Sequence, residues 1–109
     1  MSIEEKIRAA LLPLGVPDIE NGQYAGKAQE YYVFEYQTIG VNYADDAPNH
    51  KKYLATVHFF CPLNHDPTDQ RAATEQALFD AGFTWPETED LTDETRRHIA
   101  FEFEDVGAI

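Results

Sequence analysis

The hydrophobic pattern changes its period along the chain, and each change predicts an element of the fold. Near the N-terminus, apolar residues recur at the three- and four-residue spacing of an amphipathic helix. These positions are Ile3, Ile7, Ala10, Leu11 and Leu14. Ser2 and Glu5 form a capping-box sequence at the start of this helix. Pro13 and Gly15 predict that it ends near Leu12.

Helical spacing returns over residues 67–81. The buried stripe is predicted to consist of Thr74, Ala77, Leu78 and Ala81. Asp66 before Pro67 is typical of a helix start, and Gly82 is a typical stop. Phe79 lies about 100° around the helix axis from Leu78. It is therefore expected on the flank, in contact either with Phe83 or with another subunit.

Two aromatic-rich runs, 31–39 and 53–60, have the composition of β-strands and flank a polar stretch at 40–52. They predict a long β-hairpin with an extended tip. The inward positions are Tyr32, Phe34 and Tyr36 on the first strand, and Tyr53, Ala55, Val57 and Phe59 on the second. The opposite face of the second strand carries Leu54, Thr56, His58 and Phe60. Because that face is also largely apolar, we expect it to be covered or to meet a partner.

The remaining segments complete the predicted fold. Residues 16–22 indicate a short edge strand, since Pro17 cannot donate to a central ladder. Residues 97–104 alternate, with Ile99, Phe101 and Phe103 inward. Between the second helix and this strand, 84–95 is expected to be a solvated acidic connector, and 105–109 a frayed tail. The prediction is one α+β domain over 1–109, with two helices packed on an antiparallel sheet in the order α–β–β–β–α–β.

Composition narrows the functional classes. The chain of 109 residues is 43% hydrophobic and 13% aromatic, which predicts a folded core. It shows neither a membrane-length apolar run nor a signal-peptide pattern, so cytosolic synthesis is expected. The net charge is −12, from 20 acidic and 8 basic residues. Direct binding to nucleic-acid phosphates or anionic lipid would therefore meet repulsion.

Catalytic and metal-binding patterns are weak. No G-x-S-x-G, phosphate-binding loop or H-E-x-x-H sequence occurs. His58 and His98 fall at strand positions where they could face each other, but two imidazoles are a poor metal site. Cys61 is expected to be a buried strand-end residue, and the acidic run 87–94 lacks the glycine of a calcium loop. We therefore expect no enzyme, metal or cofactor; a small enzyme using His58 or His98 is the least favoured alternative.

Several short stretches together resemble small tail proteins of prophages and long-tailed phages. They are 11–17 (Leu-Leu-Pro-Leu-Gly-Val-Pro), the aromatic strand 31–36, Ala-Gly-Phe at 81–83, Asp-Leu at 90–91, Glu-Thr at 94–95, and His-Ile-Ala-Phe at 98–101. In element order the resemblance spans nearly the whole chain. Such proteins are related in fold to tail-terminator and tail-completion (tail-to-head joining) proteins. The chain departs from them in its acidity and in the length of its 40–52 tip.

The resemblance implies a non-catalytic virion assembly protein that forms a homo-oligomeric ring, commonly hexameric, on the phage tail. Its implied partners are other copies of itself and the tail-tube or head-connector proteins, with DNA passing through an acidic lumen. It would be made in the bacterial host cytoplasm and end in the virion tail. The hypothetical assembly surface comprises Leu54, Thr56, His58, Phe60, Tyr43, Asp45, Asp46, His50 and Phe79. The alternative is an acidic binding module, such as a DNA mimic or an inhibitor of a host protein.

Overall fold

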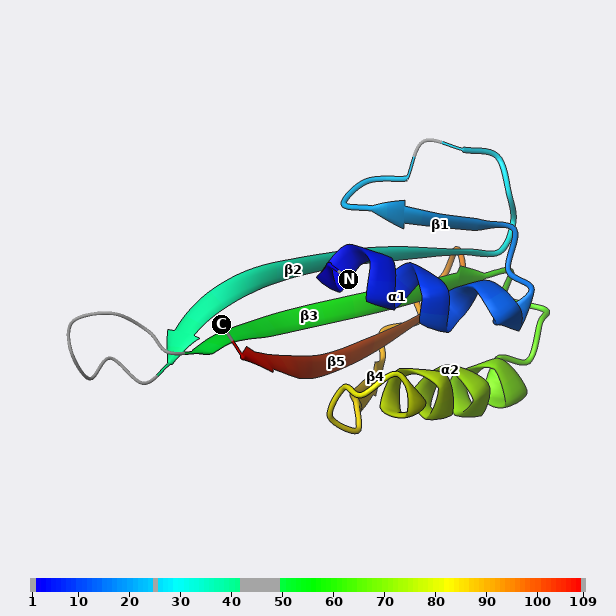
Figure 1. Cartoon of the computed structure of the whole chain (residues 1–109). Helices are drawn as coiled ribbons and strands as arrows, with labels where there is room; N and C mark the ends of the chain where they lie inside the picture. The colour runs from blue at the N-terminus through cyan, green and yellow to red at the C-terminus, as the bar shows by residue number, and fades with distance from the viewer. Residues whose placement is uncertain (1, 25, 42–49, 109) are drawn as a thin grey trace.

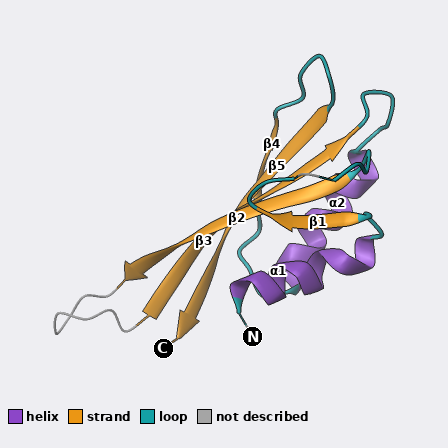
Figure 2. Ribbon diagram, turned by 90° about the horizontal axis from the view of Figure 1, so that it is seen from above, coloured by secondary structure: helices purple, strands orange, loops and turns teal. Residues whose placement is uncertain are grey.

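A five-stranded sheet with both helices on one face forms the α+β fold of this chain (Figures 1 and 2). The computed structural model describes residues 2–24, 26–41 and 50–108. Its elements are α1 (Ile3–Leu11), the 3-10 turn η1 (Leu12–Leu14), β1 (Asp18–Asn21), β2 (Tyr31–Val41), β3 (His50–Cys61), α2 (Thr68–Asp80), β4 (Glu87–Asp90) and β5 (Arg97–Ala108). The hairpin predicted from the sequence is β2–β3, and its strands run further into the 40–52 stretch than the pattern indicated.

The sheet has the order β1-β2-β3-β5-β4 and is mixed, so the expectation of an entirely antiparallel sheet was wrong. β1 runs parallel to β2, with Asp18 opposite Tyr31, while the other pairs are antiparallel. After β1 the chain doubles back, so that β2 starts beside Asp18, where β1 also starts. The two strands therefore run in the same direction, and the short sequence of β1 gave no sign of this.

β4 occupies part of the segment expected to be a connector. It pairs antiparallel with β5, with Glu87 opposite Glu102 and Asp90 opposite Ile99. Three of its four residues are exposed, and only Thr88 is half-buried. An edge strand of this kind has almost no hydrophobic alternation, and its acidic composition is unusual for a strand. That combination explains why the sequence pattern missed it.

The helix ends follow the predicted signals closely. The Glu5 amide donates to the Ser2 hydroxyl at 3.1 Å, so the capping residue is confirmed. α2 begins at Thr68, one residue after the predicted proline start, and the Asp66 carboxylate accepts from the Thr68 amide at 3.0 Å. Gly82 ends α2 with φ +100°, a left-handed conformation that favours glycine.

The core lies between the helices and the inward face of the sheet. It consists of Ile3, Ile7, Leu11, Val16, Tyr32, Phe34, Ala55, Val57, Phe59, Cys61, Leu78, Phe83, Ile99, Phe101 and Phe103. The predicted inward positions of all three main strands are therefore confirmed, although Tyr36 remains 38% exposed. Burial of this aromatic and aliphatic surface is the main stabilising contribution to the fold.

A buried hydroxyl network ties α2 to β2. The Thr74 hydroxyl donates to the Gln70 carbonyl at 2.7 Å, so it must accept from the Tyr32 hydroxyl, also at 2.7 Å. The Gln70 side-chain amide in turn donates to the Tyr32 hydroxyl at 2.7 Å. Every polar atom of this cluster is thereby paired, which is what burial of hydroxyl groups requires.

The C-terminal residues are part of the fold, so the prediction of a frayed tail from 105 was wrong. β5 continues to Ala108 and pairs with β3 along its whole length. Asp105 is buried and lies 2.9 Å from the Lys6 ammonium of α1. The ion pair satisfies a carboxylate that would otherwise be costly to bury.

Beyond the helices, three strands continue as an arm. We define the arm as residues 37–41 of β2, 50–54 of β3 and 104–108 of β5, which share one register. Figures 1 and 2 show it projecting past both helices. The molecule is accordingly elongated, 53 × 23 × 22 Å.

The Tyr32 network makes a testable contribution to stability. Tyr32→Phe removes a hydroxyl that both donates and accepts in a buried site, so the unfolding free energy should fall by about 1–2 kcal/mol. Tyr36→Phe is the matched control, since the Tyr36 hydroxyl makes no hydrogen bond with the described residues; its effect should be near zero. Urea denaturation followed by circular dichroism measures both, and equal effects would contradict the network.

Candidate assembly surface on the outer face of the sheet

The sheet face opposite the helices, called the outer face here, carries four of the nine predicted interface residues, namely Leu54, Thr56, His58 and Phe60. Its side chains fall in rows that cross the strands. The rows are Gln37–Leu54–Glu104, Glu35–Thr56–Glu102–Glu87, Val33–His58–Ala100–Glu89 and Tyr31–Phe60–His98. The first row lies in the arm and the last lies at the opposite end of the sheet, so the predicted residues span the whole face.

At the end away from the arm, aromatic rings cover the outer face. Tyr24 stacks on Tyr31 with ring centroids 3.8 Å apart, Tyr31 on Phe60 at 4.9 Å, and Phe60 on His98 at 4.3 Å. Arg96 lies over the rings of Tyr31 and Phe60 and donates to the Tyr31 hydroxyl. Phe60 is thus half-buried by contacts within its own chain. That it also contacts another copy stays a prediction.

His58 and His98 contact each other, as the sequence indicated. His58 Nδ1 lies 2.8 Å from His98 Nε2, and His58 Nε2 lies 3.4 Å from a Glu35 oxygen. In this contact one ring nitrogen must donate and the other must accept. Because only a neutral imidazole has an accepting nitrogen, the hydrogen bond requires at least one of the two rings to be neutral. Burial and the neighbouring His58 lower the pKa of His98. Among the described residues, no group of three or more potential ligands could hold a metal ion.

Cys61 is a buried residue at the end of β3, as predicted. Burial raises the pKa of its thiol. Because the thiolate is the nucleophilic form, this environment disfavours reactivity.

The other predicted interface residues divide by position. Leu54 and Thr56 are half-buried and line a shallow pocket with Glu35, Tyr36 and Gln37 at the base of the arm. His50 begins β3, paired in register with Val41 and Ala108. Tyr43, Asp45 and Asp46 lie outside the described residues.

Phe79 is on α2, far from the outer face in the fold. It is 50% exposed and contacts Trp85 edge-on at 5.5 Å, whereas Phe83 packs on Phe103. The expected flank contact is therefore made with Trp85 and not with Phe83. Trp85 itself is 51% exposed, whereas the neighbouring Pro86 is buried.

The open edges of the arm are a second feature of the surface. β1 pairs with β2 only as far as Phe34, and β4 pairs with β5 only from Ile99 to Glu102. Next along this edge, the Thr84 amide donates to the Glu104 carbonyl, and the Thr84 hydroxyl accepts from the Glu104 amide. Past these points, no described strand pairs with the outer edges of β2 or β5. Such edges are templates for strand pairing with another chain.

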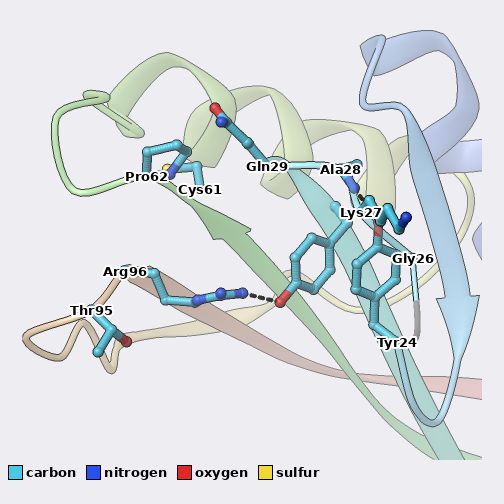
Figure 3. Close-up of a pocket in the computed structure, with 10 residues that line it drawn as sticks. Tyr24, Gly26, Lys27, Ala28, Gln29, Cys61, Pro62, Thr95 and Arg96 are labelled. Atoms are coloured by element: carbon cyan, nitrogen blue, oxygen red, sulfur yellow. Dashed lines mark hydrogen bonds between the residues drawn. The ribbon is translucent and has the colours of Figure 1, made fainter.

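A pocket of about 540 Å³ lies beside the aromatic stack, at the end where β2 begins (Figure 3). Tyr24 and residues 26–29 form one wall, which the Tyr24 hydroxyl holds in place. That hydroxyl donates to Asp18 at 2.7 Å and accepts from the Ala28 amide at 2.6 Å. Arg96 and Thr95 form the opposite wall. Asp93 positions them by accepting from the Thr95 and Arg96 amides.

Sequence reasoning did not identify this pocket. Tyr24 and Lys27 lie in a segment read only as turns, and Arg96 precedes a strand without a distinctive motif. The available signal was the position of Tyr31 in the alternation of its strand, which places its ring on the outer face beside Phe60. An aromatic ring there is exposed unless another side chain packs on it, and Tyr24 does so.

Comparisons with known proteins do not assign the chain to a group: no protein-family model matches it, and no curated protein matches its sequence. Within the described residues, no helix has the length and apolar character to cross a membrane.

The imidazole pair predicts a pH dependence of stability. Since the folded-state pKa of His98 is lowered, the unfolded chain binds more protons as the pH falls below the ordinary value of 6.5. Stability should therefore be level between about pH 7 and 8 and decline between about pH 7 and 5.5, before the carboxylates titrate. Urea denaturation across this range should show a smaller decline for His98→Gln. His65→Gln, at an exposed histidine, is the control; an identical decline in His98→Gln and wild type would contradict the assignment.

Proposed function

We propose that this protein is a structural subunit that assembles with copies of itself into a ring on a phage or prophage tail, as a tail-terminator, tail-completion or minor tail component. The observation that carries the proposal is the arm with its two open edges. β2 and β5 flank β3 on opposite sides, so their free edges face in opposite directions. Pairing the β2 edge of one copy with the β5 edge of the next would be a heterologous contact, and repeated heterologous contacts form a ring when the rotation between copies closes.

Three further features support an assembly role. Beyond its base, where Lys6 of α1 pairs with Asp105, the arm extends past both helices (Figure 1). Leu54 and Thr56 leave partly apolar surface at its base. The candidate chemical groups, Cys61 and the imidazole pair, are held in structural contacts. The assignment to a phage tail rests on the sequence resemblance, and the arm supports the oligomeric part of it.

An acidic binding module remains the second candidate, and one observation favours it. Glu35, Glu87, Glu89 and Glu102 lie on the same outer face, as carboxylates that imitate phosphates would. Tight, salt-sensitive binding of the monomer to a DNA-binding protein, without self-assembly, would support this candidate over the ring.

Edge-blocking variants test the ring. Gln37 and Thr38 are exposed on the open edge of β2, so Gln37→Lys with Thr38→Lys should leave the fold within about 0.5 kcal/mol of wild type. Lysine on an edge opposes strand pairing, and rings should be lost. Ala72→Lys with Gln76→Lys, on the exposed face of α2, adds the same charge and should assemble normally.

Sedimentation velocity and negative-stain electron microscopy measure the outcome, with and without a tail-tube protein. Rings of wild type and of the α2 control, together with monomers of the edge variant, support the proposal. Wild-type protein that stays monomeric under every condition, including on tail tubes, would refute it.

A further inference from the structure

The cations of this chain differ in whether a carboxylate lies close to them. Among cations whose side chains the structure describes, Lys6, Arg8 and Arg71 each have a carboxylate within 4.0 Å. Lys27, Arg96 and Arg97 have no carboxylate of the described residues within that distance. Lys27 and Arg96 line the same pocket, although the chain carries 20 acidic residues. Two unpaired cations in one pocket of so acidic a protein indicate a site for an anionic group.

One of the two cations, Arg96, is held in place by aromatic side chains. Arg96 is oriented by the rings of Tyr31 and Phe60. It is also oriented by its bond to the Tyr31 hydroxyl, the dashed line that ends at Arg96 in Figure 3. A guanidinium has five N–H donors, and the remaining ones have no partner in the described chain. Gly26 allows the loop to close over Tyr24, because a Cβ there would lie 2.4 Å from the Tyr24 hydroxyl oxygen. An oriented guanidinium is suited to binding a planar carboxylate.

At the opposite edge of the sheet, carboxylates lie close together. Glu87 on β4 lies directly opposite Glu102 on β5, and Glu89 lies on the same face, two residues along. All three are exposed, and none makes an ion pair with the described residues. Like charges directly opposite each other destabilise a strand pair. A cationic partner placed over them would remove this cost.

Resting on the ring proposed above, we propose that the Lys27–Arg96 pocket of one copy receives the Glu87 and Glu89 carboxylates of the next copy. In a ring built through the arms, sheets lie side by side, and the β4 edge of one copy approaches the β1–β2 edge of its neighbour. Direct pairing of β4 with β1 is opposed, since β1 carries Asp18 and Glu20. The cationic pocket follows β1 in the chain and offers the nearest favourable contact. Copies of net charge −12 repel each other at long range, and this contact supplies local attraction.

Charge reversal on either side tests the contact. The pocket variant is Lys27→Glu with Arg96→Glu, and the strand variant is Glu87→Lys with Glu89→Lys. Each places like charges across the interface, so ring formation should weaken at least tenfold. Lys27→Glu alone, at an exposed side chain without partners, should weaken rings in the same direction; it guards against misfolding caused by the loss of Arg96 packing.

Restoring complementarity should restore assembly. An equimolar mixture of the two variants pairs opposite charges at every contact of an alternating ring, and a chain carrying all four substitutions does so in a ring of any size while keeping the net charge unchanged. Sedimentation velocity should show recovery in both. If the wild type forms rings but reversal has no effect, or the four-fold variant folds without recovering, the pocket contact is wrong while the proposed function stands. If the wild type forms no rings with tail tubes present, both are refuted.

Discussion

The fold is governed by a mismatch between the length of its strands and the length of its helices. β3 has 12 residues and β2 has 11, so each spans about 35–40 Å. α1 and α2, with 9 and 13 residues, cover only about 14 and 20 Å. Two such helices can bury one half of one face. The arm and its open edges follow from this mismatch, and the outer face has no helix because both helices pack on the other face.

The mismatch also accounts for the different packing at the two ends of the sheet. At the covered end, burial is nearly complete, and the polar groups that enter the core are paired, as in the Tyr32–Thr74 contact and the Lys6–Asp105 ion pair. In the arm, the ladder of β2, β3 and β5 is supplemented at its base by the Lys6–Asp105 ion pair and by the hydrogen bonds between Thr84 and Glu104. A three-stranded sheet without a covered face is marginal alone. Contact with other copies would supply the burial that the helices do not.

Hydrophobic periodicity predicted the parts of this fold in which one face is buried and the other is not. The stripe of α2, the parity of β2 and β3, and the inward residues of β5 were all found, because burial selects residue type there. β4 was missed because both its faces are largely exposed. The direction of β1 and the continuation of β5 depend on contacts with distant segments, which local patterns do not report. The meeting of His58 and His98 was foreseen from strand parity, whereas the Lys27–Arg96 pocket depends on a loop conformation that no motif announces.

Hydrogen–deuterium exchange of assembled protein against monomer tests the central claim most directly, namely that the free edges of the arm pair between copies. Backbone amides in 35–41 of β2 and 105–108 of β5 should exchange more slowly in the ring. Amides of β3, already paired on both sides, should change little. Rings that form while the edge amides of β2 and β5 exchange at the monomer rate would contradict the account.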